Sequence, residues 1–154
     1  FFTLTLPAQK TWQTTEPVEQ ISIRSNQLPI EAQTFINTLF PSIAIKSAIR
    51  DIADDEYDVT MTNGYEMIFD NEGYWLEIDA PDNAMFPCGI IEQIVETDVF
   101  ISLLENEIAA DPIACYVKSV AYIPDYGYVI LYSLPNREEE NIIIDTDGNI
   151  WGWH

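Results

Sequence analysis

The sequence predicts an α+β fold made of two tandem α-β4 repeats, each a helix followed by a four-strand antiparallel meander. One observation is internal similarity: Ile68–Gly73 (IFDNEG) returns 75 positions later as Ile143–Gly148 (IIDTDG). A second is that each copy has a helical apolar stripe behind a proline, then alternating apolar runs separated by turn residues. Two such units side by side would form one sheet of about eight antiparallel strands with helices on one face.

Two shorter segments also recur earlier in each unit. Lys46–Ala48 returns as Lys118–Val120, and Tyr57–Val59 has its counterpart in Tyr128–Ile130. The offset drifts along the chain, which indicates small insertions between the copies. We therefore expect an N-terminal arm or extra strand at 1–26, a first α-β4 repeat at 27–80, and a second repeat with an inserted helix at 81–154.

In the first unit, the spacing of apolar residues predicts a helix over Ile30–Leu39, which Pro41 ends. Asn63-Gly64 predicts a tight hairpin because both residues accept positive φ. Asp70–Gly73 predicts a type I turn with a glycine bulge. The four strands expected around these turns are Ile43–Asp51, Glu56–Thr62, Tyr65–Asp70 and Tyr74–Asp79.

The second unit is expected to contain a helix at Cys88–Val95 and an inserted helix at Val99–Ala109. A longer loop, Pro135–Glu140, stands where the first unit has Asn-Gly. Within residues 1–26, Ile21–Ile23 is the best strand candidate. The strands expected in the second unit are Cys115–Ile123, Gly127–Leu134, Asn141–Asp145 and Asn149–Trp153.

Composition excludes several classes of protein. Six Lys and Arg stand against 26 Asp and Glu in 154 residues, a net charge of −20 and a pI near 4.1. Such a chain repels phosphate backbones, so no nucleic-acid partner is expected. The apolar fraction of 47% is typical of a folded domain, but the longest apolar runs are too short to span a bilayer.

The histidine count argues against common catalytic apparatus. The only histidine is His154, the last residue, and chain ends are usually frayed. A Ser-His-Asp catalytic triad, by contrast, needs a rigidly held imidazole. Zinc-type Cys and His spacing is absent as well. We therefore expect no enzyme activity and no cofactor. The chain begins at Phe1 with neither Met nor a leader, so we expect that a leader was removed or the chain trimmed.

Three groups of carboxylates invite other interpretations. Asp145–Asn149 has the look of a calcium loop, but its glycine comes fourth rather than sixth, so a structural turn is favoured. The acidic run from Asp51 to Asp58 is interpreted as a solvated loop, with a weak divalent-cation site as the alternative. Glu66 and Glu77 could serve glycoside hydrolysis only in a water-excluding cleft, which an open sheet does not supply. No metal site is predicted.

Cys88 and Cys115 are the two cysteines. They either form one disulfide in an oxidising compartment or remain two buried free thiols. A bridge would close a loop of roughly 27 residues and contribute about 3 kcal/mol in the chain-entropy model.

Strict alternation along the strands predicts which side chains face away from the helices. In the first unit, Ala48, Arg50 and Trp75 are expected to face outward and Leu76 inward. In the second unit, Trp151 is expected inward. The expected outward set there is almost entirely apolar: Tyr116, Lys118, Val120, Tyr122, Val129, Leu131, Ile143 and Ile150.

An exposed apolar patch of that size needs a cover. One candidate is the chain itself, through Phe1, Phe2, Leu4 and Trp12. Another is weak self-association, and a third is a partner protein or peptide of unknown identity. The residues that would bind such a partner are Trp75, Tyr116 and Tyr122 as aromatic anchors, Lys118 as the lone cation, and Leu131 and Ile143.

The pattern of motifs resembles the PepSY-like, beta-lactamase-inhibitor-like family of secreted Gram-negative proteins, over residues 28–153 in two copies. It implies a periplasmic or surface-anchored protein with a curved sheet and helices behind it. Its best-known relatives resemble inhibitors that grip a partner with the concave face and carry a disulfide within a repeat, which favours a Cys88–Cys115 bridge. The motifs that carry the resemblance are Leu28-Pro29, Phe35-Ile36, Phe40-Pro41, Tyr57-Asp58-Val59, Asn63-Gly64, Phe69-Asp70 and Gly73-Tyr74-Trp75.

These observations together predict a non-enzymatic secreted binding module that recognises a protein or peptide through the outward face. The alternative is a structural, envelope-associated protein whose sheet face is covered by its own arm or by self-association. A third and weaker alternative is a carboxylate-only enzyme or a cation-binding protein.

Overall fold

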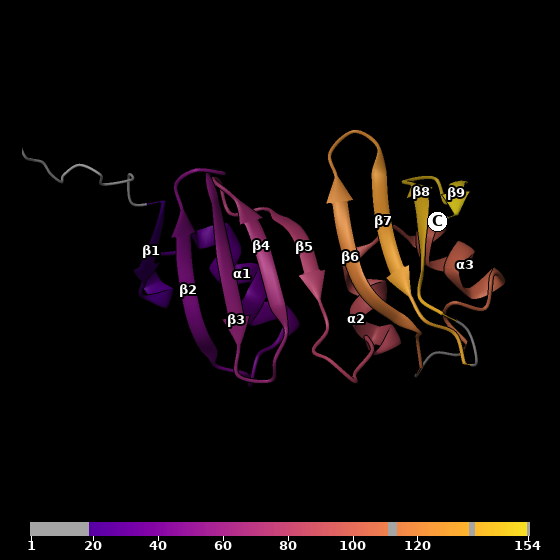
Figure 1. Cartoon of the computed structure of the whole chain (residues 1–154), viewed down its shortest axis with the longest axis horizontal. Helices are drawn as coiled ribbons and strands as arrows, with labels where there is room; N and C mark the ends of the chain where they lie inside the picture. Colours follow the sequence, from indigo (N-terminus) through magenta and orange to yellow (C-terminus); the bar gives the residue numbers. More distant parts are fainter. Residues whose placement is uncertain (1–18, 111–113, 136–137, 154) are drawn as a thin grey trace, which may run out of the picture.

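Nine antiparallel strands form one open sheet in the computed structural model, which describes residues 19–110, 114–135 and 138–153 (Figure 1). Each strand pairs only with its neighbours in sequence, so the sheet order is β1 to β9 without a crossover. This confirms the α+β class with an antiparallel sheet. The strands are β1 (Gln20–Ile23), β2 (Ile45–Asp51), β3 (Glu56–Met61), β4 (Glu66–Asp70), β5 (Trp75–Asp79), β6 (Val117–Ile123), β7 (Gly127–Tyr132), β8 (Glu140–Asp145) and β9 (Ile150–Trp153).

Within the described residues, three α-helices and one short 3-10 helix accompany the sheet: η2 (Ser25–Gln27), α1 (Ile30–Leu39), α2 (Cys88–Ile94) and α3 (Thr97–Glu105). Pro29 precedes α1 and Pro87 precedes α2, where a missing N–H costs no hydrogen bond. The helix expected as an insertion over Val99–Ala109 is α3, which begins two residues earlier and ends four residues earlier than expected. Figure 1 shows α1 behind β3 and β4, and α2 behind β6.

One row of cross-strand partners crosses the whole sheet and defines its inner face. The seven residues between the ends of this row are at most 3% exposed, so they form the centre of the core. Phe35 of α1 contacts the rings of Phe69 and Trp75 on the same face. The row runs Ile23, Ala48, Val59, Met67, Ile78, Val120, Ile130, Ile142 and Trp153.

The two halves of the sheet meet where β5 pairs with β6. This ladder has three pairs, Glu77 with Ala121, Ile78 with Val120 and Asp79 with Ser119. The backbone continues the contact beyond it, because Ala80 donates to the carbonyl of Lys118 at 2.9 Å.

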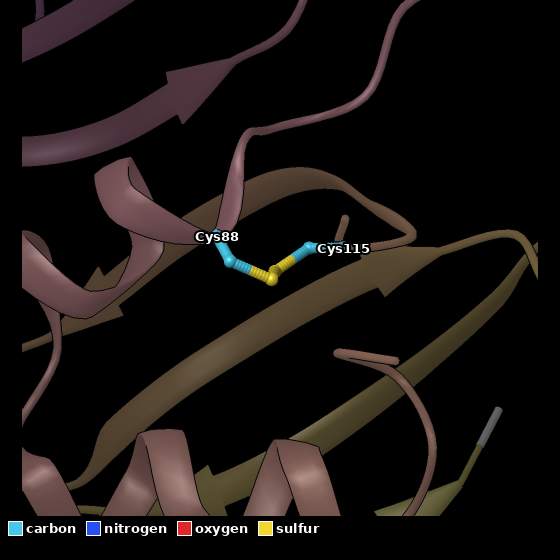
Figure 2. Close-up of a disulfide and its surroundings, with 2 residues drawn as sticks. All are labelled: Cys88 and Cys115. Atoms are coloured by element: carbon cyan, nitrogen blue, oxygen red, sulfur yellow. A yellow bond between two sulfur atoms is a disulfide. The ribbon is translucent and has the colours of Figure 1, made fainter. Parts of the chain in front are cut away.

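Cys88 and Cys115 form a disulfide within the long connection between β5 and β6 (Figure 2). Cys88 is the first residue of α2, and Cys115 lies two residues before β6. Both cysteines are buried, and Pro87 and Ala114 beside them form an isolated β-bridge. The bridge therefore fixes the start of α2 to the entrance of β6.

Glycine turns close the corresponding hairpins of both halves. Gly73 donates to Asp70 and Gly148 to Asp145, each at 3.0 Å and each with positive φ. The Asn63-Gly64 hairpin differs from the expectation, since only Gly64 takes positive φ while its N–H donates to the carbonyl of Met61. The turn is therefore a type I turn followed by a left-handed glycine.

Four β-bulges overturn part of the expected alternation. Lys46 and Lys118 are the extra residues at register shifts in β2 and β6. Leu76 and Trp151 are the extra residues in β5 and β9. An extra residue reverses the face of every side chain beyond it, which a strict period of two cannot anticipate.

The expected outward positions of six residues are consequently wrong. Val120 is fully buried in the inner row, Tyr122 pairs with buried Tyr128, and Ile150 pairs with buried Ile144. The same reversal places three residues of the first half on the inner face: Ala48, Arg50 and Trp75. The expected cover formed by Phe1, Phe2, Leu4 and Trp12 lies outside the described residues.

Candidate binding face of the sheet

The face opposite the inner row, here called the outer face, carries a second continuous row of partners. Its side chains from β2 to β8 are all half-buried, in contrast to the fully buried inner row. In the view of Figure 1, α1 and α2 lie behind the sheet. This row runs Ser22, Ile49, Asp58, Ile68, Glu77, Ala121, Val129, Ile143 and Gly152.

The part of the outer face on β3–β5 is acidic. Asp58 and Glu77 lie in the central row, and Glu66 pairs directly with Asp79 beside it. Burial raises the pKa of Glu77 to about 7, and a hydrogen bond to Asp79 and that residue's charge add to the effect. Burial also raises the pKa of Asp58, together with the charges of neighbouring carboxylates. Like charges are therefore crowded here.

No basic side chain among the described residues forms an ion pair with these carboxylates. The salt bridge found in the described part of the chain joins Arg50 to Asp55. The hydrogen bond from Arg50 lowers the pKa of Asp55, to which the amide of Asn71 also donates. This ion pair stabilises the loop between β2 and β3. The negative charge of the acidic part of the outer face therefore has no ion-pair partner among the described residues.

The part of the outer face on β6–β8 is apolar. Val129 and Ile143 are cross-strand partners, and Leu131 pairs with Ser119 next to them. Of the residues expected to bind a partner, Leu131 and Ile143 are the two that share this face. The apolar surface is smaller than expected because Val120, Tyr122 and Ile150 turn inward.

The other expected anchors lie elsewhere. Trp75 stacks on Phe35 and on Tyr128, and Tyr122 contacts both Trp75 and Tyr128, so these rings belong to the core. The Tyr128 hydroxyl donates to Glu96, just before α3.

Tyr116 and Lys118 lie near the start of β6. Tyr116 lines a cavity of about 430 Å³ with Leu104, Leu134 and Pro135. Lys118 occupies the β6 bulge.

A groove of about 580 Å³ lies at the end of the apolar part, between the β6–β7 and β8–β9 turns. Tyr126 and Trp151 border it, 75% and 74% exposed. Ile123 and Ile143 contribute apolar surface. Sequence reasoning missed these two aromatic residues. The 75-residue offset carried no signal for Trp151, because its counterpart Leu76 was also expected to face inward.

Two of the three carboxylate groups have structural roles, and the third, Glu66 and Glu77, lies on the outer face described above. Asp145 accepts hydrogen bonds from the backbone N–H groups of Asp147 and Asn149 and from the Trp151 indole, and these bonds lower its pKa. Asp51 accepts from the backbone N–H of Asp54 in the acidic loop. In the parts of the chain that the structure describes, no group of three or more His, Cys, Asp or Glu side chains is placed to hold a metal ion.

None of the helices in the described residues is both long enough and apolar enough to cross a membrane.

Comparison with known proteins agrees with the fold. The model of the family described as "Putative beta-lactamase-inhibitor-like, PepSY-like" matches residues 55–150. No curated protein matches the chain.

Three solved structures from Bacteroides are similar over almost their whole length. One, a periplasmic protein of unknown function from Bacteroides vulgatus, is 20% identical with a TM-score of 0.65, over 88% of this chain and 98% of that one. A second periplasmic protein from Bacteroides vulgatus is 25% identical with a TM-score of 0.64, over 90% and 99%. A protein from Bacteroides thetaiotaomicron described as "calcium-regulated periplasmic" is 25% identical with a TM-score of 0.65, over 88% and 96%.

The family match covers well over half of the chain and confirms the resemblance found in the motifs. The similar structures are described as periplasmic, and the protein is a secreted protein of the periplasm or cell surface. The chain belongs to the PepSY-like, beta-lactamase-inhibitor-like family.

Proposed function

We propose that this protein is a non-enzymatic binding module that recognises a protein or peptide through the outer, concave face of its sheet. The observation that carries the proposal is the outer row itself. It crosses the sheet with half-buried side chains, and its two parts differ in chemistry, one acidic and one apolar. Protein interfaces combine apolar contact area with polar and charged surface.

Leu131 and Ile143 are the proposed contact residues of the apolar part, with Lys118 at its border. Trp75 and Tyr122 have a supporting role, because the contacts of their rings with each other and with Tyr128 hold β5 against β6 and β7 from behind. A rigid sheet presents its outer side chains with little loss of conformational entropy on binding, which favours affinity.

We also propose that the sheet arose from two tandem α-β4 repeats, at 27–80 and 81–154. The bulges support this, since Lys46 and Lys118 occupy the same place in β2 and β6, and Leu76 and Trp151 the same place in β5 and β9. In each half, a helix also approaches the glycine turn between the last two strands of that half. A Cβ on Gly73 would meet the start of α1, and one on Gly148 would meet the start of α3.

Site-specific photo-crosslinking in periplasmic extract tests the proposed function. A photoreactive residue at Ile143 should yield a crosslinked partner, and the same residue at Ile101, exposed on α3, serves as the matched control. The product should disappear when Leu131→Asp is added. Equal products from both positions, or none from Ile143, would contradict recognition through the outer face.

The alternative is a structural, envelope-associated protein whose sheet is covered by its own N-terminal arm or by a second copy. Deleting residues 1–18 distinguishes the cases. An open face predicts that the truncated protein stays monomeric in sedimentation, whereas an arm that covers the sheet predicts aggregation. A crosslinked product of twice the chain mass would identify self-association instead.

A further inference from the structure

The groove between Tyr126 and Trp151 differs from the rest of the outer face. Tyr126 belongs to the β6–β7 turn, where its N–H donates to the carbonyl of Ile123. Trp151 is the extra residue of the β9 bulge. Two large aromatic side chains, each about three-quarters exposed, thus line the groove together with the apolar side chains of Ile123 and Ile143. Exposed aromatic rings of this kind mark contact sites more often than random surface.

Trp151 is oriented although it is exposed. Its indole N–H donates to Oδ2 of Asp145 at 2.8 Å. Asp145 is itself held by the backbone N–H groups of Asp147 and Asn149, each at 2.9 Å. The indole is therefore positioned before any ligand arrives, which lowers the entropic cost of binding.

The groove is strongly anionic. Three carboxylates line it, from Asp125, Asp145 and Asp147, and the described residues that line it include no basic side chain. The hydrogen bonds to Asp145 hold its pKa low, so this carboxylate stays ionised in the neutral range. A net charge of −20 over the whole chain adds a long-range field of the same sign.

We infer that this groove receives an Arg or Lys side chain from the protein segment bound on the outer face, an inference that rests on the proposed function. The aliphatic stem of such a side chain fits against Ile123 and Ile143. Its cationic head would lie over the Trp151 indole, where cation–π attraction operates within about 6 Å of the ring centre. Asp125 and Asp147 complete the charge complementarity.

The carboxylates favour this occupant over a neutral sugar. Aromatic platforms serve both ligands, and carboxylates accept hydrogen bonds from sugar hydroxyls, but a neutral sugar gains no ion pair from the three negative charges beside the ring. A cation gains a favourable Coulomb interaction with each of them.

A defined peptide tests the inference without knowledge of the natural partner. The probe is acetyl-(Arg-Leu)3-amide, titrated into the full chain while backbone amide and indole N–H resonances are followed by NMR. We expect saturable shifts of the Trp151 indole and of the amides in both turns. Replacing each Arg of the probe by citrulline, a neutral isostere, should weaken binding about fivefold or more.

Matched variants locate the effect. Trp151→Ala and Tyr126→Ala should each weaken binding of the peptide about fivefold. Trp153→Ala should change it less than twofold, because Trp153 lies in the same strand at 50% exposure but packs against Tyr132 on the inner face. Tyr74→Ala, an exposed turn aromatic of the first half, is the control for Tyr126.

Three results would overturn the inference. One is equal binding of the citrulline peptide, and a second is equal binding by Trp151→Ala. A third is a larger indole shift with maltohexaose than with the arginine peptide, which would identify a sugar site. Peptide-induced shifts confined to Ile68 and Glu77 would overturn the groove assignment but not the proposed function, which the crosslinking experiment decides separately.

Discussion

Removing the disulfide should be the most informative test of how the two halves are held together. The double variant Cys88→Ala, Cys115→Ala deletes a bridge across 27 positions of sequence. In the chain-entropy model a loop of that length constrains the unfolded state by about 3.5 kcal/mol. Both cysteines are buried beside the inner face, so loss of packing at the sulfurs adds to this. We therefore expect the free energy of unfolding to fall by at least about 3 kcal/mol.

Urea unfolding followed by circular dichroism measures this loss. A fall of about 3.5 kcal/mol corresponds to a melting temperature lower by about 7–14 °C for a chain of this size. The wild-type protein in excess reductant should unfold like the double variant, and the variant itself should not respond to reductant. A loss below about 1 kcal/mol would refute the reasoning, because it would mean that residues 88–115 are already restrained in the unfolded chain.

Three further perturbations follow from the packing. Ile130→Ala, at the fully buried centre of the inner row, should cost about 3 kcal/mol in urea unfolding, whereas Val129→Ala on the outer face should cost less than about 1 kcal/mol. Gly148→Ala should cost about 2 kcal/mol or more, because φ is +88° and the new Cβ would lie 2.5 Å from a carbonyl oxygen of α3; normal stability would contradict this. The pKa of Glu77 is raised from 4.5 to about 7, so the folded state binds its proton more tightly, and this group's stabilisation is lost as pH rises through about 7. Between pH 5 and pH 8 the melting temperature of the wild type should therefore fall more steeply than that of Glu77→Gln. An equal fall in both proteins would exclude Glu77 as the cause of this pH dependence.

The positions of the elements were predictable because local chemistry determines them. α1 begins and ends at the predicted residues, since proline stands at both ends and an apolar stripe lies between them. The central strands β3, β4, β7 and β8 have the predicted faces, because no extra residue interrupts their own alternation.

The faces of the first and last strands of each expected α-β4 repeat were not predictable. β2, β5, β6 and β9 each contain a bulge, and a bulge depends on the register with the neighbouring strand rather than on local composition. For this reason Trp75 and Tyr122 were expected on the outer face although their rings pack against each other and against Tyr128 in the core. The same error concealed Trp151, which was expected to point inward.

The disulfide also shortens the connection across the seam between β5 and β6. Without the disulfide, the whole loop of residues 80–116 must be closed before β5 and β6 can pair. With it, the path runs from 80 to 88, through the bridge, and on from 115, which lowers the closure cost by about 1 kcal/mol. A reduced chain has a long hinge next to a ladder of only three pairs. Under reducing conditions, the β5–β6 ladder should therefore open more often and expose two strand edges, so that thiol oxidation helps to keep the two halves paired.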